Sequence, residues 1–251
     1  MIVITGPGRS GTSFLALLYR ELGFDPGGTW MAQTNAGLEA GQYARINTEM
    51  ASELGTVVAP RGGARSFRSL ERLGRASERR LPPGIGPRVS SALRGVRYRR
   101  NTLDLMDWTK LDGVVARYGE RLKSLSQETE VVKDPRFCWT LQAWLAGGAS
   151  ISAVVLALRP LDAMVESRVR AGMIPEESGI WAKNSFAYGI GLVMAAVSEY
   201  RVPMTVLRFP DFLNDPEDLH RRLPLPEERS WDQFHDAFVT VHDASLVHDR
   251  R

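Results

Sequence analysis

Cysteine, histidine and long apolar runs are scarce in this chain of 251 residues. Cys138 is the only cysteine, which excludes an internal disulfide and any cysteine-based metal site. We expect it to be a small buried side chain rather than a nucleophile. No stretch approaches the roughly 20 apolar residues of a membrane span, and residues 1–15 lack the charged start and apolar centre of a secretory signal. These absences predict a cytoplasmic protein with no membrane partner.

Lysine is also rare, and arginine carries most of the positive charge. Residues 61–100 contain twelve arginines, no lysine and two glutamates, together with several glycines and prolines. We expect a basic, mobile insert, either a solvated loop or a lid that binds an acidic substrate or partner. Few aromatic residues interrupt it, so it does not read as a nucleic-acid module. The rest fits a single domain over residues 1–251, which at this length buries about 70% of its unfolded surface.

The first 23 residues join a strand to a helix through a glycine-rich turn. Residues 2–5 are apolar or β-branched and predict a buried strand. Apolar residues then recur at helical spacing up to Gly23, namely Phe14, Leu15, Leu18 and Leu22. Backbone N–H groups in such a turn, with the helix dipole behind them, can bind a phosphate. The alternative is a tight turn whose glycines serve only the backbone.

One residue separates this turn from an ATP-binding loop. The pattern G-x-x-x-x-G-K-[ST] matches at Gly6, Gly11 and Ser13, but Thr12 stands where the phosphate-binding lysine belongs. The cation of this turn is Arg9, which lies inside it.

Three more strands are predicted, and each ends in a short polar segment. They cover residues 130–133, 151–158 and 203–209, and helices are predicted near 111–125 and over 181–200. Alternating strands and helices indicate an α/β fold, a three-layer sandwich around a mostly parallel sheet, similar to P-loop NTPases. Ligands of such folds bind beyond the carboxyl ends of the strands. One of these ends carries Arg159, and Ser167 follows two helical turns later, so both can reach one anion.

Four segments resemble the sulfotransferases that use 3′-phosphoadenosine 5′-phosphosulfate (PAPS). Residues 9–14 resemble the PKSGTTW-type loop, and residues 159–167 resemble the signature R-x-P-x-D-x-x-x-S, although here the proline follows the arginine directly. Residues 132–136 are similar to the K-D-P-R strand end of bacterial members. Residues 207–216 are similar to a late segment of the family, with Pro210 in place of its glutamate.

The resemblance implies transfer of a sulfuryl group from PAPS to a hydroxyl of a small molecule or glycan, leaving adenosine 3′,5′-bisphosphate and requiring no metal. It implies that the 5′-phosphosulfate is bound by the loop residues, Gly8, Arg9, Ser10, Gly11, Thr12 and Ser13. It further implies that Arg159 and Ser167 hold the 3′-phosphate, and that Arg9 and Lys133 stabilise the transferring group. No histidine stands where many members carry their general base, so we expect a carboxylate, Glu39 or Asp134, in that role. The acceptor, the adenine-binding residues and the oligomeric state are left open.

Two other functions remain possible from the residues alone. A nucleotide-dependent kinase needs a lysine in the loop and carboxylates for Mg²⁺, and the nearest candidates, Asp104 and Asp107, follow no predicted strand. A non-catalytic phosphate-binding module would instead use the basic insert to hold an anionic partner.

Overall fold

The computed structural model describes residues 1–24, 41–57, 104–171, 174, 176 and 179–248. The candidate base Glu39 and the basic insert at 61–100 lie outside these residues. The chain divides into two compact units. The first comprises Met1–Leu54, Trp108–Arg159 and Gly189–Arg251, and the second comprises Gly55–Asp107 and Pro160–Tyr188. The single domain expected over residues 1–251 stays a prediction.

The first unit holds a parallel sheet of four strands in the order β4-β1-β5-β6. The strands are β1 (Ile2–Thr5), β4 (Val131–Lys133), β5 (Ala153–Leu158) and β6 (Met204–Arg208). The first three are almost wholly buried, as expected of parallel strands with both faces covered. The α/β class and the parallel sheet predicted from the alternating pattern are thus confirmed.

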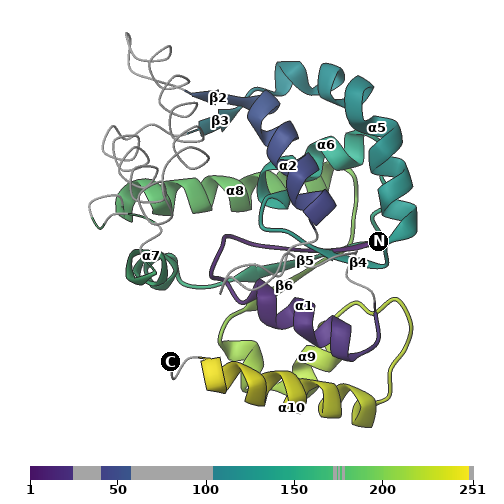
Figure 1. Cartoon of the computed structure of the whole chain (residues 1–251), viewed down its shortest axis with the longest axis vertical. Coiled ribbons are helices and arrows are strands. Elements are labelled where there is room, and N and C mark those ends of the chain that lie inside the picture. The colour runs from purple at the N-terminus through teal and green to yellow at the C-terminus, as the bar shows by residue number, and fades with distance from the viewer. Residues whose placement is uncertain (25–40, 58–103, 172–173, 175, 177–178, 249–251) are drawn as a thin grey trace, which may run out of the picture. The chain divides into compact units, whose positions relative to one another are not determined.

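Helices cover both faces of this sheet (Figure 1), an arrangement consistent with an α/β sandwich. One face carries α1 (Thr12–Glu21) and α10 (Trp231–His248), and the other carries α2 (Gly41–Leu54), α5 (Leu111–Glu128) and α6 (Phe137–Ala146). The short elements η1 (Trp108–Lys110), η3 (Asp211–Leu213) and α9 (Pro216–Arg222) complete the unit. Alternate residues of β1 point to opposite faces: Ile2 and Ile4 pack with α1 and α10, whereas the Thr5 hydroxyl meets Cys138 on α6.

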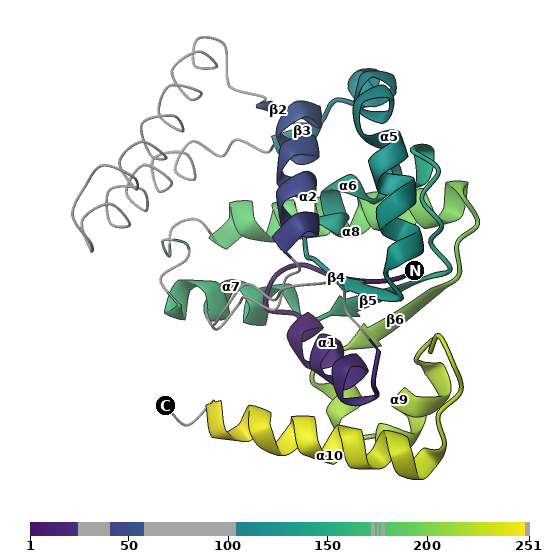
Figure 2. The same ribbon diagram turned by 45° about the vertical axis from the view of Figure 1, so that its right-hand side comes forward.

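The sheet register brings four polar strand ends to one edge. Ile4 pairs with Lys133, Thr5 with Leu156, and Leu158 with Arg208. Because all four strands run in the same direction, the segments that follow them leave from the same edge (Figure 2). The loop after β1 therefore has β4 on one side and β5 on the other.

The second unit includes a two-stranded antiparallel ribbon that the sequence did not predict. It consists of β2 (Gly55–Val57) and β3 (Asp104–Met106), so Asp107 does follow a strand. Three-residue strands are too short to leave a periodic pattern, which explains the miss. The ribbon is not part of the parallel sheet, so Asp107 is not at one of that sheet's strand ends. The same unit contains α7 (Leu161–Arg170).

The long helix α8 (Gly179–Glu199) runs through the boundary between the two units. It was predicted, with one face made of Trp181, Ser185, Tyr188, Leu192, Ala196 and Tyr200. Of that face only Ala196 is buried, and the other buried residues of the helix are Ala182, Phe186, Gly189, Val193 and Val197. Small and apolar residues all round this helix blur the pattern from which a face is read. Contrary to the expectation from composition, it is also long and apolar enough to cross a membrane, although one such helix is a weak indication.

Candidate functional site

The loop between β1 and α1 has the backbone of an anion cradle. Gly6, Arg9 and Gly11 all have positive φ, at 154°, 78° and 93°. Changes of backbone handedness in such a short segment turn successive N–H groups toward one point. Gly11 is the N-cap of α1 and supplies no side-chain acceptor for the first turn. The positive end of the helix dipole thus faces this loop without a side-chain cap.

Gly6 and Gly11 cannot be replaced without displacing a neighbour. A Cβ on Gly6 would lie 2.2 Å from the carbonyl oxygen of Ala157 on β5. A Cβ on Gly11 would lie 2.7 Å from the ring of Phe209. The glycines therefore serve close packing against β5 and the end of β6 as well as backbone freedom.

Ser10 carries a hydroxyl with no hydrogen-bond partner among the described residues. Its side chain is fully buried, and a Cβ added to Gly6 would lie 2.7 Å from its Oγ. Buried hydroxyl groups in folded proteins nearly always have a partner, so an isolated one calls for a water or a ligand group. Thr12 is buried as well, whereas Gly8, Arg9, Gly11 and Ser13 are partly exposed. The loop residues therefore fit a bound oxyanion.

Lys133 ends strand β4 and Asp134 follows it, next to the loop. Lys133 is only 2% exposed and pairs with Ile4 on β1. Asp134 is fully buried, and its main chain is bound to β1 on both sides: its N–H donates to the Ile4 carbonyl at 3.2 Å, and its own carbonyl accepts from the Thr5 hydroxyl at 3.2 Å. The end of β4 is thus fixed to the residue that precedes Gly6.

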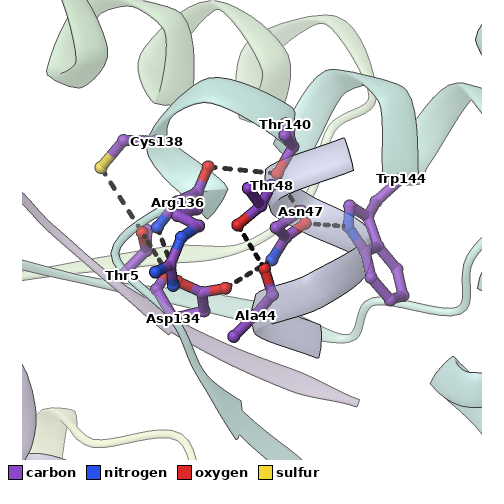
Figure 3. A network of polar contacts seen from close by, with 9 residues as sticks. All are labelled: Thr5, Ala44, Asn47, Thr48, Asp134, Arg136, Cys138, Thr140 and Trp144. Atoms are coloured by element: carbon purple, nitrogen blue, oxygen red, sulfur yellow. Dashed lines mark hydrogen bonds and ion pairs between the residues drawn. The ribbon is translucent and has the colours of Figure 1, made fainter. Parts of the chain in front are cut away.

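The Asp134 carboxylate belongs to a buried polar network (Figure 3). Its Oδ1 accepts from the backbone N–H of Arg136 at 2.9 Å and from the Arg136 guanidinium at 3.0 Å, and its Oδ2 accepts from Asn47 Nδ2 at 2.9 Å. Donors on both oxygens favour the charged carboxylate and fix its position. This geometry suits a positioning group, and the choice between Asp134 and Glu39 as the base stays a prediction, because Glu39 lies outside the described residues.

Arg159 follows β5 and lies above an aromatic ring that the sequence did not single out. Its Cζ is 5.3 Å from the centroid of the Phe209 ring, a cation–π distance, and the same ring is the one that packs on Gly11. Phe209 follows β6, and its N–H donates to the Leu158 carbonyl at 2.7 Å. An aromatic residue directly after a strand of this sheet was the available signal. The Phe209 ring thus lies next to both Arg159 and Gly11, the residue that precedes α1.

Ser167 lies on α7, in the second unit, and is partly exposed. The helix begins at Leu161, so the predicted position of Ser167 about two turns into it is correct. Arg159 belongs to the first unit, as the last residue of its segment Trp108–Arg159. Their joint binding of one phosphate stays a prediction.

Cys138 is buried beside the site, on α6. Burial raises the pKa of its thiol to about 11, and the hydrogen bond with Thr5 only partly offsets this effect. A thiol that is neutral at physiological pH is a poor nucleophile, as expected from the sequence.

Neither described hollow of the surface coincides with the loop. The larger, of about 720 Å³, is lined by Met1, Ile2 and Ala153 at the amino ends of the strands. The smaller, of about 330 Å³, is lined by residues of α1 and α10. We place the candidate site by its chemistry, since the loop, Lys133 and Arg159 share the edge where α/β proteins bind ligands.

Among the described residues, no group of three His, Cys, Asp or Glu side chains is arranged to hold a metal ion. Comparison with protein-family models, with curated proteins and with solved structures finds no match to this chain. The function therefore has to be argued from the residues of the site.

Proposed function

We propose that this protein is a PAPS-dependent sulfotransferase that acts on a hydroxyl of a small molecule or glycan. The observation that carries the proposal is the loop after β1, whose cation is Arg9 and which lies between Lys133 and Arg159 at neighbouring strand ends. Such an arrangement suits a donor whose phosphosulfate binds in the loop and whose second phosphate binds beside it, at Arg159.

In this proposal the loop residues hold the 5′-phosphosulfate. The N–H groups of Gly11, Thr12 and Ser13 face the 5′-phosphate, and the isolated Ser10 hydroxyl supplies a further donor. Arg159 and Ser167 take the 3′-phosphate through charge-assisted hydrogen bonds. Phe209 keeps the Arg159 guanidinium over its ring, which limits the orientations open to that side chain.

Sulfuryl transfer needs positioning and cations more than covalent chemistry. The bond between sulfur and the bridging phosphate oxygen breaks as a bond to the acceptor oxygen forms, and negative charge grows on the bridging oxygen. Arg9 and Lys133 are the cations assigned to that charge. The acceptor hydroxyl loses its proton to a carboxylate, for which Glu39 is proposed.

Calorimetric titration tests the donor site without knowledge of the acceptor. Adenosine 3′,5′-bisphosphate should bind about 10- to 100-fold more tightly than AMP, because the second phosphate gains charge-assisted hydrogen bonds of about 1.5–3 kcal/mol. Equal affinities would refute the 3′-phosphate site. Magnesium-dependent turnover of ATP would favour a kinase instead.

The variant Arg159→Ala should lower the affinity for the bisphosphate to that for AMP and leave AMP binding unchanged. Arg208→Ala is the matched control. It removes the same charge at the neighbouring strand end, but Arg208 is exposed and paired with Asp211 at 3.3 Å. Loss of bisphosphate affinity in both variants would indicate a general effect of positive charge and would argue against a 3′-phosphate site at Arg159.

A further inference from the structure

Asn47 is a fully buried amide in the middle of α2, and its hydrogen bonds connect three parts of the first unit (Figure 3). Its Oδ1 accepts from Thr140 Oγ1 at 2.8 Å and from Trp144 Nε1 at 2.7 Å, both on α6. Its Nδ2 donates to Asp134 Oδ2 at 2.9 Å. A buried amide at this point connects α2 and α6 with the end of β4.

The Trp144 indole N–H fixes which way this amide points. An indole N–H can only donate, and only the oxygen of the amide accepts, whereas the Thr140 hydroxyl can also donate to the Arg136 carbonyl at 3.1 Å. The Nδ2 group must therefore face Asp134, and no flipped orientation satisfies the three partners. The hydrogen bond to the carboxylate is set by the helices and not by a mobile side chain.

Asp134, whose carboxylate accepts this hydrogen bond, is adjacent to residues of the candidate site. It follows Lys133 directly, and its main chain is bound to Ile4 and Thr5, just before the cradle begins at Gly6. The hydrogen bond from Asn47 to the Asp134 carboxylate adds a side-chain restraint on the residue that follows Lys133. Asn47 thus bonds to the neighbour of Lys133 from a position 87 residues before that neighbour in the chain.

We infer that Asn47 is a positioning residue, which acts through Asp134 to hold Lys133 where the transferring sulfuryl group lies. The inference rests on the proposed function. It concerns the sulfuryl group alone, because the cradle and Arg159 hold the nucleotide independently of α2. Small displacements of a charge-stabilising group cost large factors in rate and affinity.

The test compares PAPS with adenosine 3′,5′-bisphosphate, which lacks the sulfuryl group, by calorimetric titration. Asn47→Ala should weaken PAPS binding about tenfold and bisphosphate binding less than twofold. Lys133→Ala should give the same selective loss of PAPS affinity. The double variant Asn47→Ala with Lys133→Ala should have the same ratio of PAPS to bisphosphate affinity as Lys133→Ala alone, because Asn47 acts through Lys133. A full additional loss in the double variant would refute the inference.

Tyr43→Phe is the matched control. Tyr43 lies one turn before Asn47 on α2, is equally buried, and its hydroxyl bonds to the Leu125 carbonyl at 2.9 Å and to Thr129, away from Asp134. It should lower stability without changing the ratio of the two affinities. If it changes that ratio as Asn47→Ala does, the role of Asn47 is structural only.

Two further outcomes are distinguishable. Wild-type protein that binds the bisphosphate no better than AMP refutes the proposed function, and this inference with it. Wild-type protein that does discriminate, together with an Asn47→Ala variant that binds both ligands unchanged, refutes the inference alone. Should Asn47→Ala not fold, Trp144→Phe removes only one of the two donors to Oδ1 and should show a smaller loss of the same selectivity; unchanged selectivity there would refute the inference.

Discussion

Arg9 occupies a backbone conformation that arginine normally avoids. Its φ of 78° lies in the left-handed region, where a residue with a Cβ is less stable than glycine by roughly 1–2 kcal/mol. Glycine is used at Gly6 and Gly11, where φ is also positive, so the same solution was open at position 9. An arginine in a strained position of a candidate phosphate site is consistent with a functional side chain.

The strain at Arg9 can be measured by comparing two substitutions that remove the same side chain. Arg9→Gly should be more stable than Arg9→Ala by about 1 kcal/mol, because only alanine retains the steric conflict of a Cβ at positive φ. Urea denaturation measures the difference, and both variants should have lost PAPS turnover.

Arg20 provides the control for this comparison. It is an exposed residue of α1. Because glycine destabilises a helix, Arg20→Gly should be less stable than Arg20→Ala by about 1 kcal/mol, the reverse of the order expected at Arg9. The same order of stability at both positions would contradict the strain at Arg9.

At the residue scale the sequence was informative where the signal is local. The positive-φ positions Gly6 and Gly11 and the cation Arg9 could be recognised because they lie within six residues of one another. The contacts of Phe209 with Gly11 and of Asn47 with Asp134 could not be predicted, since they join residues that are 198 and 87 positions apart in the sequence. Contacts at that separation depend on the order of strands in the sheet.

Helix α1 has a glycine with positive φ at each end, and only one of them is enclosed. Gly11 has a φ of 93° and Gly23 a φ of 89°, so alanine has a similar backbone cost at both. The added Cβ would meet Phe209 at 2.7 Å at the first position and nothing within 4 Å at the second. The pair thus separates backbone strain from steric conflict.

Gly23→Ala should lower the free energy of unfolding by about 1–2 kcal/mol, and Gly11→Ala should lower it by more. Replacing Phe209 by alanine removes the conflict, so the additional loss should shrink in the double variant Gly11→Ala with Phe209→Ala. Equal losses at both glycines, measured by urea denaturation, would show that Phe209 does not restrict Gly11.

At the element scale, prediction succeeded for runs with a clear period or a clear boundary. The strand before the loop, α1 up to Gly23 and the helix from Leu111 were all found, because apolar runs and glycine ends identify them. The ribbon of β2 and β3 was missed, since two three-residue strands pair across about 50 residues. The face of α8 was misassigned, because apolar and small residues occur on every side of it.

At the scale of the whole molecule, the parallel sheet brings segments that are distant in the sequence to one edge. The predicted strands follow one another along the chain as β1, β4, β5 and β6, but in space β1 lies between β4 and β5. That order places the cradle between Lys133 and Arg159. The sequence predicted that these residues would share an edge, and only the pairing pattern assigns the central position to β1.

Burial of Cys138 should make the stability of the fold depend on alkaline pH. The thiol of the unfolded chain has the ordinary pKa of 9.0, whereas burial raises the pKa in the folded protein to about 11. Between these values the unfolded chain has released the proton that the folded protein retains, so the free energy of unfolding falls as pH rises. Two pKa units correspond to about 3 kcal/mol in full, of which about 2 kcal/mol is present at pH 11, and the effect is absent below pH 8.

The variant Cys138→Ala isolates this contribution, because every other titrating group is common to both proteins. At pH 7 the variant should be the less stable of the two, since it loses buried contacts on α6. As pH rises from 9 to 11 the gap in urea-unfolding free energy should close and then reverse, because only the wild-type protein has a thiol that must ionise on unfolding. Curves that stay parallel over this range would mean that the thiol ionises as readily in the folded protein as in the unfolded chain, and that the core beside Thr5 admits water.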